Sequence, residues 1–230
     1  IYGGLVDSTG DINAHSTYGS AFGVYAYGLY GTSTVVSSGD IDATSSAGNA
    51  MGIMNIGIYD SVIDNSGNIY ASTTNGLAYG AYAYSLFGNA VIYNTGDINV
   101  GSNSDATGLF AKAQSYTAYI YNSGTVSVSS AFSPAYGVYA SAANGNAIVV
   151  NNGDVYAYGF GSDASGIVTI ASNVAYVYNS GNQTAYSVYG DAIGIVEVAN
   201  SGDAIAINSG NLYAESIFGN AYGIYAKATF

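Results

Sequence analysis

One short phrase recurs along the whole chain of 230 residues at an almost constant spacing. SSGDIDA at residues 37–43 returns, for example, as NTGDINV at 94–100 and as NSGNLYA at 208–214. Successive glycines of this phrase lie 28 or 29 residues apart. A fixed period of this length predicts an array in which each repeat packs only on its neighbours. The eight glycines are Gly10, Gly39, Gly67, Gly96, Gly124, Gly153, Gly181 and Gly210.

Each repeat contains three segments with the pattern of β-strands. After the phrase glycine, the second residue is Ile, Val or Leu in every repeat but one, which has Gln183, and the fourth is always Ala or Val. The residue between them is polar or Tyr, so the segment alternates with the period of two that is typical of a strand. A second inward row precedes the glycine, with Val, Ile or Ala four residues before it.

The third segment follows the pattern A-x-G and has the same period, as in Ala78 and Gly80. Both of its alternating rows are largely apolar. We expect the row of Ala, Gly and Tyr to face inward, because it never becomes polar. The opposite row admits polar residues, among them Asn55, Thr107, Ser165 and Glu197.

The sequence therefore predicts an all-β fold, a single parallel β-solenoid over residues 1–230. It would have eight coils of 28–29 residues, each with about three short strands, and no recognisable capping segments. At ~4.8 Å per coil the rod would be roughly 38 Å long.

In such a rod, equivalent residues of successive coils stack in columns. The residue two before each phrase glycine is Asn in six coils, and stacked Asn side chains can join their amides from coil to coil. The phrase is thus interpreted as a corner, and its glycine as the residue that permits a positive φ in a tight turn. The predicted ladder consists of Asn65, Asn94, Asn122, Asn151, Asn179 and Asn208.

Charge is scarce and one-sided. Only 7% of the residues are charged, against roughly 25% in an ordinary soluble domain. Two Lys and no Arg stand against 14 acidic residues, which gives a net charge of −12. Binding to nucleic acid or to an anionic membrane surface needs clustered cations, so neither partner is expected.

The chain has no Cys, and no apolar run reaches the ~18–20 residues of a membrane span. We expect an extracellular or cell-surface protein that is stabilised by something other than disulfides. Because it does not begin with Met, we expect a processed protein or an excised segment.

The repeats NSG-x-I-x-A and A-x-G-I-Y-A resemble the passenger regions of bacterial autotransporters and related surface adhesins. This resemblance covers the whole chain, from STGDINA at its start to AYGIYAKA at its end. It implies a right-handed parallel β-helix on the cell surface or released from it. It implies no activity, since function does not follow from fold.

No residue pattern points to catalysis, and we expect the protein not to be an enzyme. The single histidine, His15, occupies an outward position where other coils have, for example, Thr44, Ser72 or Ser129. A lyase on this fold usually employs a basic residue, commonly Arg, which is absent. A glycosidase needs two suitably spaced carboxylates, and Asp60, Asp64 and Asp163 are interpreted as solvated loop acids.

We expect no cofactor and no required metal. The weak exception is calcium at Asp11 and Asp40, which should be neighbours in one column and could share a hard cation. The acidic, glycine-rich nonapeptide of calcium-binding β-rolls is absent.

Tyrosine is abundant, with 25 residues. Exposed aromatic residues in such number often mark a contact surface, and three interpretations remain open: stacking that stiffens the sheet, lateral packing between rods, and glycan binding. Those predicted to point outward are Tyr70, Tyr93, Tyr119, Tyr121, Tyr156, Tyr176, Tyr178 and Tyr213.

Two functions remain. In the first, the chain is a structural subunit whose uncapped end coils stack head-to-tail on other copies to make an extracellular filament. The ends are nearly in phase: Gly223 to the Gly10 of a next copy is 17 residues, against 15 or 16 between equivalent glycines within the chain. In the alternative, it is a segment of an autotransporter-like adhesin that binds a glycan or host surface.

Overall fold

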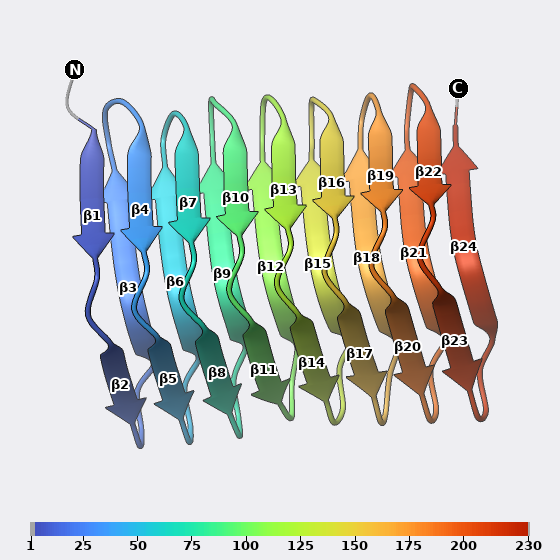
Figure 1. The fold of residues 1–230 in the computed structure, drawn as a ribbon, viewed down its shortest axis with the longest axis horizontal. Helices are drawn as coiled ribbons and strands as arrows, with labels where there is room; N and C mark the ends of the chain where they lie inside the picture. The colour runs from blue at the N-terminus through green and yellow to red at the C-terminus, as the bar shows by residue number, and fades with distance from the viewer. Residues whose placement is uncertain (1–2, 230) are drawn as a thin grey trace.

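The computed structural model describes residues 3–229, and all of its regular structure is β-strand. Three parallel sheets of eight strands each run along a rod (Figure 1). Each coil contributes one strand to each sheet, so the fold is the predicted β-solenoid of eight coils with three strands per coil. Of the predicted span, residues 1, 2 and 230 lie outside the described residues.

Sheet A consists of the strands that precede the corner: β1 (Gly4–Ser8), β4 (Ser33–Ser37), β7 (Ser61–Asn65), β10 (Ala90–Asn94), β13 (Ala118–Asn122), β16 (Ala147–Asn151), β19 (Ala175–Asn179) and β22 (Ala204–Asn208). Sheet B follows the corner: β2 (Ile12–Ser16), β5 (Ile41–Ser45), β8 (Ile69–Thr73), β11 (Ile98–Ser102), β14 (Val126–Ser130), β17 (Val155–Gly159), β20 (Gln183–Ser187) and β23 (Leu212–Ser216). Sheet C holds the longest strands: β3 (Ala21–Gly28), β6 (Ala50–Gly57), β9 (Ala78–Ser85), β12 (Ala106–Ala113), β15 (Ala135–Ala142), β18 (Ala164–Ala171), β21 (Ala192–Ala199) and β24 (Ala221–Ala228).

The coils are stacked in register, so that equivalent residues pair directly. Ile92 of β10, for example, pairs with Ile63 below and Ile120 above. Because the backbone hydrogen bonds of a parallel sheet join one coil to the next, the constant period of the sequence becomes a set of straight columns. None of the described residues forms a helix long and apolar enough to cross a membrane.

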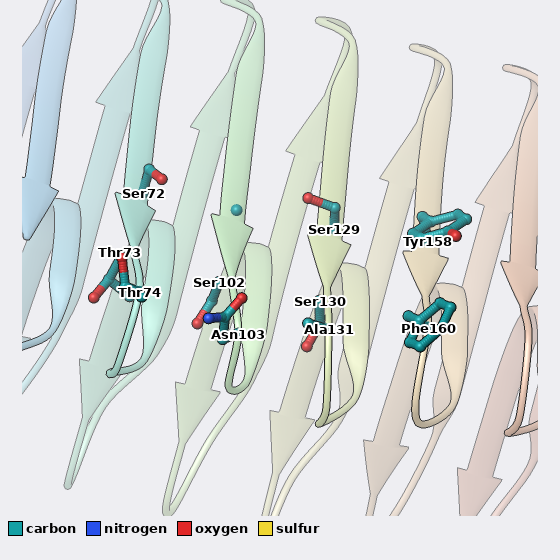
Figure 2. A pocket seen from close by; sticks show the side chains of 11 residues that line it. Ser72, Thr73, Thr74, Ser102, Asn103, Ser129, Ser130, Ala131, Tyr158 and Phe160 are labelled. Atoms are coloured by element: carbon teal, nitrogen blue, oxygen red, sulfur yellow. The ribbon is translucent and has the colours of Figure 1, made fainter. Parts of the chain in front are cut away.

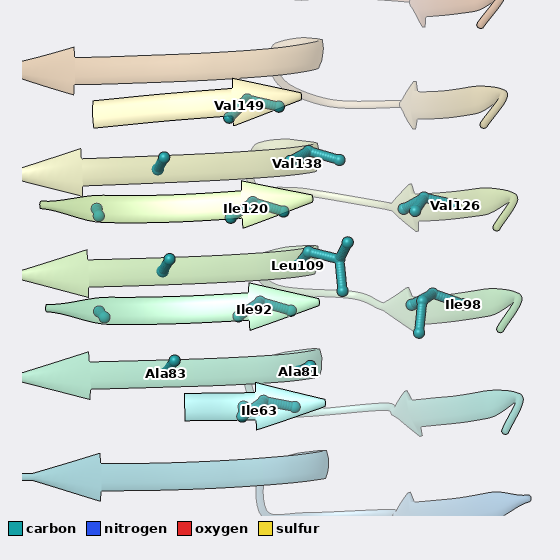
Figure 3. Packing of buried hydrophobic residues seen from close by; sticks show 14 of the residues in the cluster. Ile63, Ala81, Ala83, Ile92, Ile98, Leu109, Ile120, Val126, Val138 and Val149 are labelled. Carbon is teal, nitrogen blue, oxygen red and sulfur yellow. The ribbon is translucent and has the colours of Figure 1, made fainter. Parts of the chain in front are cut away.

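The core is a thin layer of stacked aliphatic side chains between sheet A or B on one side and sheet C on the other. Figure 3 shows Ile63, Ile92 and Ile120 of sheet A in one column opposite the strands of sheet C. These Ile side chains are fully buried, as are the Ala side chains of sheet C that face them. Small residues on one side let the layers approach closely enough for the branched side chains to fill the space between them.

Sheet C departs from the predicted alternation at its glycine. In β9 both Gly80 and the following Ala81 are buried, and the facing of every later residue is inverted. The expectation that the row of Ala, Gly and Tyr stays inward is therefore correct up to the glycine and wrong after it. Tyr82 points outward, whereas Asn55 and Glu197 belong to the inward column.

The cause of this inversion is the missing side chain of the glycine. A Cβ at Gly80 would overlap Ile98 Cγ2, which enters the space from the next coil, and would lie 2.5 Å from the carbonyl oxygen of Gly108. The same overlap with the next coil recurs at Gly23, Gly52, Gly108 and Gly137. Each of these glycines therefore forms a notch that receives an Ile or Val of sheet B from the following coil.

The corner positions require glycine for a reason other than the predicted positive φ. The only positive-φ glycine among the described residues is Gly31, at 80°, so the corners do not need the left-handed region. A Cβ at Gly124 would instead overlap the carbonyl oxygen of Gly96 in the coil below, and Gly153 and Gly181 repeat this relation. Close approach of stacked backbones, rather than backbone conformation, excludes side chains from the corner.

Candidate functional site

The Asn side chains at the corner form a continuous ladder inside the rod. Asn122 is fully buried, and its Nδ2 donates to Asn151 Oδ1 at 2.8 Å and to the carbonyl oxygen of Gly124 at 2.7 Å. It accepts from Asn94 Nδ2 at 2.8 Å. The Asn122 amide thus donates one hydrogen bond to the next coil and one to a backbone carbonyl in the turn of its own coil. The same bonds run from Asn65 to Asn208 through all six predicted residues.

The ladder is incomplete where Asn gives way to Ser. Ser37 occupies the same column one coil before Asn65, and it is buried. Neither Ser37 Oγ nor Asn65 Oδ1 has a hydrogen-bond partner. The shorter serine side chain cannot span the distance between coils, so the first two coils lack this tie to the rest of the rod.

The acidic column beside the corner forms a second ladder. Asp11 Oδ1 accepts from the backbone N–H of Asp40 at 3.0 Å, and Asp40 Oδ1 accepts from that of Asn68 at 2.8 Å. Asp97 and Asp154 bind the next coil in the same way. The two calcium candidates therefore each have an oxygen engaged by the backbone. No group of three or more His, Cys, Asp or Glu suited to a metal ion occurs within residues 3–229.

Of the residues considered for catalysis, His15, Asp60 and Asp163 each contact a neighbouring coil. The His15 imidazole is exposed and contacts Thr44 Oγ1 of the next coil through Nδ1. Asp60 Oδ1 accepts from the backbone of Asn89 at 2.7 Å, and Asp163 Oδ1 accepts from that of Asp191 at 2.8 Å. These two carboxylates therefore bond to the backbone of the next coil, as the carboxylates of the acidic ladder do.

Glu197 is a carboxyl group inside the core that the sequence analysis placed outside it. Its side chain has no solvent exposure, and neither carboxyl oxygen has a hydrogen-bond partner. In its column it lies between Thr169 and Ala226. Burial raises the pKa of Glu197 to about 7, although the nearby backbone of Val177 offsets part of the rise. The sequence feature that could have indicated this burial is a charged residue in a column that is Ala in most coils.

A shallow groove of about 440 Å³ crosses sheet B on its outer side (Figure 2). Its floor includes Ser72, Gly101 and Ser129 from three successive coils, and Tyr158 with Phe160 stands at one end. A Cβ at Gly101 would lie 3.6 Å from Ser129 Oγ, which is ordinary contact, so the missing side chain leaves an open space. The groove offers hydroxyl groups beside aromatic rings.

The Tyr residues predicted to point outward do so on sheets A and B, where each is half-buried or exposed. Several aromatic rings stack between coils. The rings of Tyr158 and Tyr186 lie 5.2 Å apart and nearly parallel, and those of Tyr189 and Phe218 lie 5.1 Å apart. Stacking between coils thus occurs, mostly among rings other than the eight Tyr predicted to point outward.

The largest aromatic cluster lies on the outer side of sheet C, which sequence reasoning missed. Phe110 stacks on Tyr139 at 4.8 Å and meets Tyr82 edge-on at 5.2 Å. Tyr79 and Tyr136 extend the cluster along the rod. Burial by these neighbours raises the pKa of Tyr82 to about 12, so its phenol stays neutral. Both rows of this strand are apolar, so their alternation did not indicate which row faces outward.

The two end coils expose surfaces that are covered elsewhere in the rod. Every described residue of β24 is exposed, including Ile224 at 44%. A Cβ added at Gly223 meets nothing within 4 Å, so the notch that receives Ile or Val in inner coils is open here. At the opposite end, Ile12 occupies the sheet B column that fills such notches, and it is only partly buried. Gly223 and Ile12 thus occupy positions that successive inner coils bring together as a notch and the residue that fills it.

Comparisons with models of protein families, with curated proteins and with solved structures found no match to this chain. The function is therefore inferred from the surfaces themselves: the exposed end coils, the groove over Gly101 and the aromatic cluster on sheet C.

Proposed function

We propose that this protein is an extracellular structural protein whose end coils stack head-to-tail on other copies to build a β-solenoid filament. The observation that carries this proposal is the open notch at Gly223 together with the partly uncovered Ile12. Seating Ile12 of a second copy in that notch repeats the contact that Gly23 makes with Ile41 inside the rod.

Stacking in this way also pairs both exposed sheet edges. The N–H and C=O groups of an edge strand are a template for pairing with another strand. A contact that joins one end to the opposite end of the next copy does not close, and it yields a fibre. Eight coils at ~4.8 Å give an axial rise of roughly 38 Å per subunit. An extracellular location is supported by the absence of Cys and by the net charge of −12.

End-to-end assembly is tested by filling the notch. Gly223→Val is expected to leave the fold intact, because the new side chain meets nothing within 4 Å, and to abolish filaments in electron micrographs. Gly10→Val should act in the same way from the other end, since a Cβ there is also unopposed. Gly101→Val, on the outer side of sheet B, is the matched control and should assemble normally. Wild-type protein that stays monomeric at high concentration, or filaments that persist in both end variants, would refute the proposal.

A second proposal is that the rod is a segment of an adhesin that resembles autotransporter passengers and binds a glycan. It is supported by the groove over Ser72, Gly101 and Ser129, where hydroxyls can bind sugar hydroxyls and Tyr158 can contact an apolar sugar face.

Glycan binding is tested separately with the Gly101→Val variant. If the groove binds glycans, Gly101→Val should fill it and remove binding on a glycan array, while filament growth stays unchanged. Gly223→Val should show the reverse behaviour. A wild-type protein that binds no glycan, or a Gly101→Val protein that binds as well as the wild type, would exclude the groove as a binding site.

A further inference from the structure

The outer face of sheet C is a continuous apolar surface along the rod. In the column that follows each sheet C glycine by two residues, every outward residue is apolar or aromatic. Among the described residues, no carboxylate occupies an outward position on this sheet. The column is Tyr25, Met54, Tyr82, Phe110, Tyr139, Val168, Val196 and Tyr225.

Both cations of the chain lie on this same face. Lys112 extends over the ring of Tyr84, with its Nζ 6.0 Å from the ring centroid, and Lys227 follows in the same column near the end of β24. The only two basic residues, against 14 acids, therefore lie on the outer face of sheet C. Asp105 and Asp163 lie close enough to its Tyr79 and Tyr136 to add to the rise in pKa that burial causes there.

The outer face of sheet A is also largely apolar but carries the opposite charge. Asp7 and Asp64 lie there among Val, Ile and Tyr, including Tyr119 and Tyr121. Sheets A and C pack against each other across the core, so their outer faces point away from each other (Figure 1). One rod therefore presents an apolar face with lysines on one side and an apolar face with aspartates on the other.

We infer that rods pack laterally, with the outer face of sheet C on one copy against the outer face of sheet A on the next. Contact between two sheet C faces would join the two faces that hold the lysines, whereas contact between sheets C and A joins a face with lysines to a face with aspartates. Because the two faces differ and lie on opposite sides, this contact is also open and extends into a layer of rods. It requires no end-to-end stacking.

The area is sufficient for such a contact. Strands of five residues at ~3.3 Å each, over eight coils at ~4.8 Å, give sheet A an outer face of roughly 630 Å². Covering it against the larger sheet C face buries about 1,250 Å² in total, which falls within the ~1,200–2,000 Å² of stable interfaces. The aromatic residues of both faces are the types that contribute most to such contacts.

The test uses protein that carries Gly223→Val, so that end-to-end growth does not interfere. In that background, Phe110→Glu alters the sheet C face and Tyr119→Glu alters the sheet A face. A carboxylate buried without a partner is costly, so each variant should weaken lateral association at least about tenfold in sedimentation velocity. Met54→Glu provides a second sheet C variant outside the Tyr82–Phe110–Tyr139 cluster. Ser129→Glu on sheet B adds the same charge and should associate as the parent does.

Mixing the variants identifies which faces meet. Phe110→Glu keeps a native sheet A face and Tyr119→Glu keeps a native sheet C face, so an equimolar mixture should form a dimer with one copy of each. That dimer also shows that both variants are folded. If the Tyr119→Glu variant associates with itself, if the mixture stays monomeric, or if the parent protein is monomeric at high concentration, the inference is wrong.

Discussion

Asn122→Leu is expected to lower the melting temperature by at least roughly 4 °C, measured by far-UV circular dichroism. Asn122 lies in the middle of the amide ladder, where it accepts from Asn94 and donates to Asn151. Leucine is close to asparagine in size but can neither accept nor donate. One amide hydrogen of Asn94, the Oδ1 of Asn151 and the carbonyl oxygen of Gly124 therefore lose their partners inside the rod.

The size of the effect follows from the cost of unpaired buried groups. Each costs about 1–3 kcal/mol, so the three together lower the free energy of unfolding by about 3–9 kcal/mol. Asn99→Leu is the matched control, because Asn99 is exposed on β11 and the chemical change is the same. Equal melting temperatures for the two variants would mean that the ladder contributes no stability.

Glu197→Gln is expected to stabilise the protein at pH 8.5 and to have little effect at pH 4. The pKa of Glu197 rises from its ordinary 4.5 to about 7 because the carboxyl group is buried. A raised pKa in the folded state means that the folded protein binds the proton more tightly than the unfolded chain does. Its stabilising contribution is complete below pH 4.5 and is lost as the pH rises through 7. Glutamine stays neutral throughout.

The expected difference at high pH has an upper limit of about 3 kcal/mol, from a shift of roughly 2.5 units at 1.36 kcal/mol per unit. Only the last coil separates Glu197 from the open end of the rod, and solvent screening there reduces the difference to about 1–3 kcal/mol. Chemical denaturation of both proteins at pH 4, 6 and 8.5 measures it. Glu215→Gln, at an exposed position on β23, controls for the loss of one negative charge. A difference between wild type and Glu197→Gln that does not grow with pH would contradict this account.

The same residue links pH to the end of the rod. Glu197 lies one coil below β24, which carries the open notch at Gly223. Its partner Ala226 belongs to the coil that the filament proposal places at the junction between copies. Comparing filament length for wild type and Glu197→Gln at pH 8.5 would show whether this charge also affects assembly.

The sequence by itself determined the architecture of this protein. A period of 28 or 29 residues with strand alternation leaves few structures besides a solenoid, since each coil must hydrogen-bond to its neighbours. Columns follow directly from that period. The Asn side chains that meet as amide pairs, such as Asn94 and Asn122, are the ones that the repeat places in one column. The outward facing of Tyr on sheets A and B follows from simple alternation in the same way.

Only the tertiary structure decided which way sheet C faces and why its glycines are there. Both rows of that strand are apolar, so alternation does not distinguish inside from outside, and a glycine has no side chain to mark its face. The space at Gly80 is occupied by Ile98 of the following coil, and this contact inverts the facing of Tyr82. The burial of Glu197, the open notch at Gly223 and the aromatic face of sheet C all follow from it. These features depend on the fit between one coil and the next, which a pattern read along a single strand does not contain.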